Sequence, residues 1–308
     1  MGIKYDSVIV FGPTGAVGSA VAVEAGKRGA KVWLAMRDTT KAIPGLEESS
    51  GKFERVQADL SDAESVKRAV SQSGAKAAFF YQVRTKDGMK LTIGAMKESG
   101  IEYVVFLSSL TILPDDDIRA ITPDKIIPFA HSSVEVTIED LGLPSTMLRA
   151  GAFAHNIIWQ NLDRSSEPWK AKIPISERKS DGIVQKDIGR VGGAVLVERP
   201  SESQKEIIYL YGPELLTREE QLTIIEKVSG KKIETEVQSF EEYGKYMLTK
   251  GFPEFIVNYL LKADNGDRND AYYANGRHEE GVANVKKYSG YEATTYEGYV
   301  REFLTKAA

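Results

Sequence analysis

The stretch Ser7 to Val21 reads S-V-I-V-F-G-P-T-G-A-V-G-S-A-V. Ser7–Phe11 is a short apolar and β-branched run, typical of a strand that is buried on both faces. A helical pattern follows from Val17 to Arg28. Between the two, glycines recur at every third position, as Gly12, Gly15 and Gly18. The stretch therefore predicts a strand, a glycine turn and a helix.

Such a junction is suited to hold an anion, because free backbone N–H groups and the positive helix end point to one place. A side chain at Gly12 or Gly15 would block the phosphates of a dinucleotide, and one at Gly18 would hold the helix away from the strand. The spacing G-x-x-G-x-x-G differs from the standard G-x-G-x-x-G, and a tight turn without a ligand is the alternative. The residues expected to contact the dinucleotide here are Gly12, Thr14, Gly15, Ala16, Val17 and Gly18.

The order of strand and helix repeats along the first half of the chain. Four predicted helices end at a glycine, the residue that most easily takes the left-handed conformation there: Gly29, Gly74, Gly100 and Gly142. Further strands are predicted at Lys31–Met36, Phe53–Gln57, Lys76–Val83, Glu102–Ser109 and Ser145–Arg149, and further helices at Ala63–Ser73, Lys86–Ser99 and Ser132–Leu141. Repeated βα units build a parallel sheet with helices on both faces. Residues 1–150 are therefore predicted to form an α/β, doubly wound dinucleotide-binding domain of the Rossmann type.

The alternation is lost beyond Arg149. Ser165–Ser180 is polar and mixed in charge, which predicts a loop with at most a short strand. Thr217 and Glu220 form a capping box that opens a helix. Other helices are predicted at Asp187–Val197, Phe240–Lys250, Phe255–Leu261 and Tyr296–Leu304, and strands at Ile207–Leu210 and Ile233–Val237. This pattern is too irregular for a domain with its own sheet, so residues 151–308 are expected to form a small α+β substrate-side subdomain, partly interleaved with the later strands of the main sheet.

Composition narrows the classes of protein. The 308 residues carry a net charge of -4, which gives no sign of a nucleic-acid partner. The absence of cysteine excludes disulfides, thiolate metal sites and cysteine nucleophiles, and it fits a reducing compartment. No apolar run is long enough to span a bilayer, and the first residues lead directly into a strand, so we expect no signal peptide and a cytoplasmic location.

The residue after the second strand bears on the choice of cofactor. An NAD-binding fold usually places an acidic residue there, to bond the ribose 2′-hydroxyl. This chain has Arg37, whose guanidinium matches a 2′-phosphate, and Lys41 can add a second charge. Asp38 is an alternative partner for a 2′-hydroxyl, and a solvated charged loop is the third interpretation. The arginine favours NADP(H) over NAD(H).

Polar residues lie at or just after the ends of the next three strands, at the edge where open α/β sheets bind ligands. Asp59 can accept from the exocyclic amine of an adenine while Leu60 covers the ring, although Asp59, Ser61 and Asp62 are also placed to cap the next helix. Residues near the nicotinamide are expected to be Tyr81, Gln82, Ser108 and Ser109, the last on the substrate side.

By these motifs the chain resembles the NmrA-like family of atypical short-chain dehydrogenases/reductases. The matching segments are V-F-G-P-T-G-A-V-G, R-D after the second strand, A-D-L, F-L-S-S, residues 141–156 (L-G-L-P-S-T-M-L-R-A-G-A-F-A-H-N), residues 184–190 and residues 209–217. The resemblance covers about the whole chain. It implies a Rossmann domain with a small C-terminal subdomain, and NADP(H) binding to which Gly151 and Phe153 are expected to contribute. Family members include NADPH-dependent reductases of small metabolites and redox-sensing regulators that bind the cofactor without turnover.

The resemblance also shows what the chain lacks. Reductases of this kind use Tyr-x-x-x-Lys, or a lysine alone, at the helix before Leu143. Here His131 stands in the place of the lysine and residue 127 is isoleucine. His131 can serve as acid/base, bond the nicotinamide ribose, or be a surface histidine. His155 is the second acid/base candidate. Tyr246 and Lys250 have the right spacing but lie in the subdomain, which makes them a chance match.

Substrate contacts are expected from Ser109, Asn156, Trp159 and Trp169. Phe153 and the two tryptophans suit an aromatic wall for a planar substrate, although core packing explains each of them as well. The sequence leaves three functions open: an NADPH-dependent reductase of a small aromatic or carbonyl metabolite, an NADP(H)-sensing regulator, and a non-redox isomerase or dehydratase. The first is preferred here, with a small-molecule substrate, no nucleic-acid or membrane partner, no metal, and a monomer or homodimer as the expected state.

Overall fold

Parallel strands form the main sheet of the computed structural model, which describes residues 4–43, 45–46, 48, 51–264 and 268–307. The order in this seven-stranded sheet is β3-β2-β1-β4-β5-β6-β9. The bounds are β1 (Ser7–Phe11), β2 (Lys31–Met36), β3 (Phe53–Gln57), β4 (Ala77–Tyr81), β5 (Tyr103–Ser109), β6 (Ser145–Ala150) and β9 (Lys205–Leu210). The chain order reverses between β1 and β4, so the ligand-binding switch point of the sheet lies at these two strands.

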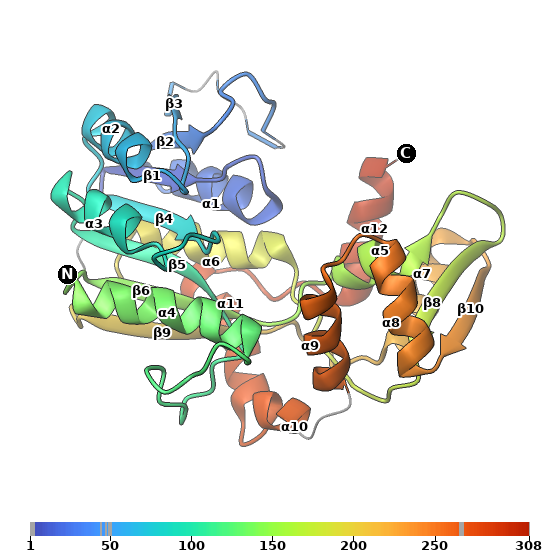
Figure 1. The fold of residues 1–308 in the computed structure, drawn as a ribbon. Helices are drawn as coiled ribbons and strands as arrows, with labels where there is room; N and C mark the ends of the chain where they lie inside the picture. The colour runs from blue at the N-terminus through green and yellow to red at the C-terminus, as the bar shows by residue number, and fades with distance from the viewer. Residues whose placement is uncertain (1–3, 44, 47, 49–50, 265–267, 308) are drawn as a thin grey trace. The chain divides into compact units, whose positions relative to one another are not determined.

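Helices cover both faces of this sheet (Figure 1). On one face lie α1 (Ala16–Lys27) and α6 (Gln185–Val197), and on the other lie α2 (Ala63–Ser73), α3 (Lys90–Glu98) and α4 (Ile126–Asp140). The main core forms on the second face, where Ile9 and Phe80 pack with Val66, Ile93 and Val134. Because both faces are covered, the central strands β1, β2 and β4 are buried and apolar at nearly every position, as the sequence predicted for Ser7–Phe11.

Small residues let α6 approach α1 closely. A Cβ added to Gly189 would lie 2.3 Å from the Cβ of Ala20, and one added to Gly193 would lie 2.6 Å from the Cβ of Glu24. Any larger residue at either position would push the helices apart, so this later segment of the chain is built to complete the first face of the sheet.

The local predictions for this half are largely confirmed. The strands lie where the apolar runs predicted, and Gly29, Gly74, Gly100 and Gly142 all have φ between +59° and +104°. The start of α4 was predicted six residues too late. It begins at Ile126, because Pro128 falls in the first turn, where no helical N–H partner is needed. His131 therefore lies in the second turn of α4 and not at its start.

A second sheet belongs to the later part of the chain. It has the order β10-β8-β7, from β7 (Leu162–Asp163), β8 (Trp169–Pro174) and β10 (Ile233–Gln238). The expectation that this region has no sheet of its own is wrong. In β8, Ala171 and Ile173 are buried while Lys170 points outward. The alternation of apolar residues and lysines in W-K-A-K-I is the period-two pattern of a half-buried strand, within the segment predicted as a loop with at most a short strand.

The chain folds into two compact units, each built from several separate segments. Unit 1 holds residues 1–150, 185–210 and 284–292, and unit 2 holds 151–184, 211–283 and 293–308. The helices not yet bounded are α5 (Asn156–Asn161), α7 (Arg218–Ser229), α8 (Phe240–Thr249), α9 (Glu254–Asp264), α10 (Arg268–Tyr273), α11 (Arg277–Ser289) and α12 (Tyr296–Ala307). None of the helices within the described ranges is long and apolar enough to cross a membrane.

Candidate dinucleotide site

The N-terminus of α1 lies open at the end of β1. Its N-cap is Gly15, which makes no side-chain hydrogen bond, whereas Asp62, Thr217 and Ser239 cap α2, α7 and α8 with theirs. The residues around this N-cap, Thr14 to Ala16, are exposed. No cap side chain thus accepts from the first-turn N–H groups at the positive end of this helix, which is the arrangement that binds an anion.

Glycine suits each of the three positions of the turn for a different physical reason. Gly12 has φ +70°, and an added Cβ would lie 2.5 Å from the ring of Tyr81. At Gly18 an added Cβ would lie 2.2 Å from the carbonyl oxygen of Gly12, so this glycine closes the helix onto the turn rather than onto the strand. A Cβ at Gly15 would meet only that same oxygen, at an ordinary 3.5 Å. The protein's own packing therefore leaves room at Gly15, which fits a phosphate group approaching the backbone.

The loop after β2 presents exposed positive charge. Asp38 Oδ1 accepts from the Thr40 N–H at 2.9 Å and from its hydroxyl at 2.6 Å. These hydrogen bonds lower the pKa of Asp38. Arg37 and Lys41 are exposed. Asp38 Oδ1 is thus engaged in its own turn while Arg37 and Lys41 are exposed, and which of these groups meets a ribose substituent remains a prediction.

Asp59 follows β3 near this loop. Its Oδ1 accepts from the N–H and hydroxyl of Ser61, and these bonds, with the charge of Arg37, lower the pKa of Asp59. The cap of α2 is Asp62, so Asp59 is not needed for that purpose. Leu60 is buried beside it. Both roles of the A-D-L segment toward an adenine remain predictions.

The polar residues at the ends of β4 and β5 differ in exposure and in hydrogen bonding. Tyr81 is 38% exposed and packs against Gly12, while Gln82 is half-buried. Ser108 is buried and donates to Glu135 Oε1 at 2.6 Å. Ser109 shares a hydrogen bond of 2.9 Å with the hydroxyl of Thr111. The Ser108 hydroxyl is therefore engaged within the protein.

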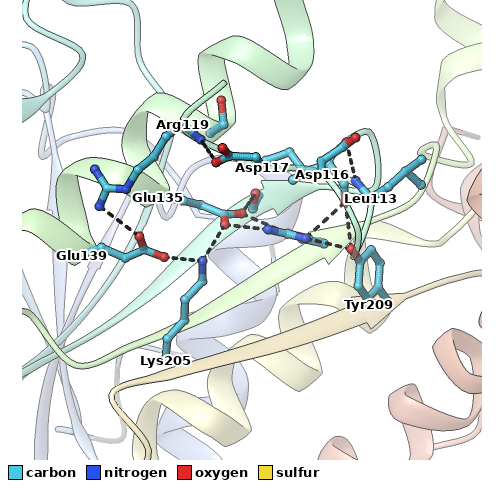
Figure 2. Close-up of polar contacts among 12 residues, drawn as sticks. Leu113, Asp116, Asp117, Arg119, Glu135, Glu139, Lys205 and Tyr209 are labelled. Carbon is cyan, nitrogen blue, oxygen red and sulfur yellow. Dashed lines mark hydrogen bonds and ion pairs between the residues drawn. The ribbon is translucent and has the colours of Figure 1, made fainter. Parts of the chain in front are cut away.

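Glu135 on α4 and Arg149 on β6 are the centre of a buried polar network. Figure 2 shows Glu135 with its neighbours Lys205 and Tyr209. Arg149 also donates to the Tyr209 hydroxyl at 2.8 Å, and Lys205 lies 3.3 Å from Glu135. Burial alone would raise the pKa of Glu135, but the hydrogen bonds from Arg149 and Ser108 and the nearby cations outweigh it and lower that pKa. Glu135 is thus held as a carboxylate by surrounding donors.

His131 lies one helical turn before Glu135, and its ring packs against Phe106 at a centroid distance of 6.0 Å. Its Nδ1 is buried without a hydrogen-bond partner among the residues that the structure describes. Burial lowers the pKa of His131 to about 4, and the charge of Glu135 only partly opposes this. The imidazole is therefore neutral at neutral pH, which removes the charged acid form from the role predicted for it.

His155, the other candidate, lies in unit 2. Its Nδ1 is 2.8 Å from the hydroxyl of Tyr299, and its ring packs against Phe303. Burial, together with the charge of Arg164, lowers the pKa of His155. The tyrosine holds the ring in one orientation, as a positioned acid/base requires.

The remaining predicted residues are also in unit 2. Gly151 is buried, and an added Cβ would lie 2.0 Å from the carboxylate of Asp181, so the protein's own packing already requires glycine there. Phe153 and Asn156 are half-buried at the start of this unit. Trp159 is 60% exposed and packs on the ring of Phe252. Their ligand roles, and that of Trp169 on β8, remain predictions.

Asp181 was missed from the sequence. It is buried and accepts from the N–H groups of Ala152 and Gly212 and from the hydroxyl of Tyr273, at 2.8 to 3.1 Å. It ties the segment after β6 to the segment after β9. Glu135 and Arg149 were also missed. A charged residue inside an apolar strand or helix face is the available signal, because a buried charge requires a partner.

A sheet of this order with a glycine turn at its switch point defines a Rossmann-like α/β protein. The model of the NmrA-like family matches residues 4–300, and the chain belongs to that family. It is 40% identical to the nitrogen metabolite regulation-like protein bik4 of Gibberella fujikuroi (strain CBS 195.34 / IMI 58289 / NRRL A-6831), over 98% of both chains. The resemblance drawn from the motifs is confirmed.

Solved structures share the fold. The NADPH-dependent quinone oxidoreductase QOR2 of Escherichia coli, complexed with NADPH, superimposes with a TM-score of 0.71 at 17% identity, covering 96% of this chain and 99% of that one. Nmra, described as a negative transcriptional regulator, gives 0.70 at 14% identity, covering 99% and 97%. At these identities the likeness shows the fold alone, and it includes both an enzyme and a regulator.

Proposed function

We propose that this chain binds NADP(H) at the α1 turn and serves as an NADPH-dependent reductase of a small aromatic or carbonyl metabolite. The observation that carries the proposal is the uncapped N-terminus of α1, with open space at Gly15, in the same unit as the exposed Arg37. In this assignment the first-turn N–H groups hold the pyrophosphate. Arg37 and Lys41 bind the 2′-phosphate, and Asp59 accepts from the adenine amine.

The bound nucleotide would supply the hydride, and the protein would supply binding and any proton. His131 is not suited to donate that proton as an imidazolium, because its lowered pKa keeps it neutral. The pKa of His155 is lowered as well, but its ring is oriented by Tyr299, and it is the acid/base that this proposal retains. In a reductase we therefore expect His155→Ala to reduce turnover by roughly 10²–10⁴-fold, with nucleotide affinity retained. His131→Ala should leave the pH profile of turnover unchanged near pH 6.5, the ordinary pKa of histidine.

A second function is favoured by specific observations. The Ser108 hydroxyl donates to Glu135, the His131 imidazole is neutral, and α4 contains no Tyr-x-x-x-Lys motif. These features suit a protein that binds NADP(H) and reports the redox state without turnover. The name of the Gibberella relative points the same way.

Two measurements separate these functions. Calorimetric titration with NADPH, NADP⁺ and NADH tests the site, and equal affinity for NADPH and NADH would contradict the NADP(H) assignment. Consumption of NADPH is then followed with a panel of quinones and small aromatic carbonyl compounds, with Gly15→Val as the matched blank. Turnover that the blank lacks supports the reductase. Tight binding with no turnover on any acceptor moves the regulator ahead.

A further inference from the structure

Side chains of β3 hold the loop after β2 from one side. The guanidinium of Arg55 donates through Nη1 to the carbonyl oxygens of Thr39 and Lys41, the latter at 2.7 Å. Gln57 Nε2 donates to the carbonyl oxygen of Arg37 at 3.2 Å. We call residues 37–41 the cationic loop. Three of its five backbone carbonyls are thus fixed by the neighbouring strand.

Arg55 is not itself available as a phosphate ligand. Its Nε lies 2.8 Å from Glu48 Oε2, and its Nη2 pairs with Glu48 Oε1. Two of the three guanidinium nitrogens, Nε and Nη2, therefore donate to a carboxylate of the same unit. By contrast, neither Arg37 nor Lys41 has an ion-pair partner among the residues that the structure describes.

The two roles are complementary. An arginine whose charge is neutralised by Glu48 uses its remaining donor on backbone oxygens, and the loop that it orders carries two exposed cations. Ordering a loop before the ligand arrives removes part of the entropy cost of binding. A nucleotide with a 2′-phosphate gains from two cations already in place, whereas one with a 2′-hydroxyl gains little.

We propose that Arg55 is a positioning residue for cofactor specificity, which holds the cationic loop so that Arg37 and Lys41 meet a 2′-phosphate. This inference rests on the proposed NADP(H) site. It predicts an effect of Arg55 on the preference for NADPH over NADH, through the shape of the loop rather than through its own charge.

The test uses the full chain and two substitutions. Arg55→Met removes the fork and the charge, and Arg55→Lys keeps the charge but cannot reach two carbonyls and Glu48 together. Arg28→Met is the matched control, because Arg28 also joins a carboxylate (Glu24 Oε1, 2.9 Å) to a backbone oxygen (Ser289, 3.0 Å) in unit 1. Dissociation constants for NADPH and NADH are measured for each protein, with amide hydrogen exchange of residues 38–41 in the free protein.

Both Arg55 variants should weaken NADPH roughly tenfold, the scale of one charged hydrogen bond, while NADH binding and the control stay unchanged. Amides of the cationic loop should exchange faster in both variants and not in Arg28→Met. If Arg55→Met keeps the wild-type preference for NADPH over NADH, the positioning role of Arg55 is refuted, while the proposed NADP(H) site is not affected. If Arg55→Lys retains the preference that Arg55→Met loses, the charge acts directly and positioning is refuted. Wild-type protein with no preference for NADPH overturns the proposed function, and the specificity role with it.

Discussion

Arg149 binds both carboxylate oxygens of Glu135 in the interior, with Nε 3.1 Å from Oε1 and Nη2 2.8 Å from Oε2, where the two side chains are 2% and 0% exposed. The pair joins β6 to α4, and Ser108 of β5 adds a third element to it. Charges placed this deep are tolerated only while each keeps its partners.

Removing one partner of this pair is expected to be costly. Glu135→Gln leaves the Arg149 charge buried and incompletely paired, so the free energy of unfolding should fall by about 3–5 kcal/mol. Urea denaturation measures this change. Glu139→Gln is the control, since Glu139 pairs with Lys205 and Arg119 nearer the surface, where a loss of at most about 1 kcal/mol is expected. Equal losses for the two variants would show that burial of the pair does not matter.

His131 should make stability depend on pH. Its pKa in the folded protein is about 4, below the ordinary 6.5, so the unfolded chain takes up a proton first as pH falls. The stability that its neutral burial contributes is full above pH 6.5 and is lost as pH falls through 4. His131→Gln should weaken the pH dependence of the urea midpoint over that window. An unchanged slope in His131→Gln would place the imidazole in water.

Arg37 should discriminate between the two nicotinamide cofactors. Arg37→Ala removes a cation that only a 2′-phosphate can use, so NADPH binding should weaken by about 1–3 kcal/mol, with NADH nearly unaffected. Calorimetry gives both constants. Arg28→Ala serves as a control at a similar net charge. Parallel losses for NADPH and NADH would mean that Arg37 contacts the common part of the nucleotide or supports the fold.

Gly15 and Gly18 should separate binding from folding. Valine at Gly15 meets only one oxygen at ordinary distance, so the protein should fold but lose dinucleotide binding. Valine at Gly18 would collide with the Gly12 carbonyl, so that variant should lose stability as well. Thermal unfolding and nucleotide titration distinguish the two. Full affinity in Gly15→Val would show that the turn has no role in binding.

The order of βα units and the site of the glycine turn were predictable from the sequence. Both depend on local signals: apolar runs of strand length, glycines at helix ends, and a cationic residue after the second strand. The predicted start of α4 was too late, because a proline in the first turn of a helix, such as Pro128, looks the same in sequence as a proline that breaks a helix. The segment of β8 reads W-K-A-K-I, which alternates apolar residues with lysines as a half-buried strand does, but its parallel partner strand β10 is distant in the sequence.

The sequence by itself determined the fold class, the family and the position of the glycine turn, because these follow from neighbours along the chain. Tertiary structure alone decided that Arg149 meets Glu135, that His131 is kept neutral beside Phe106, and that Arg55 holds the loop of Arg37. Burial and partnership are properties of segments brought together by packing. The same arginine is a surface charge, an ion-pair partner or a loop anchor according to what the fold places around it.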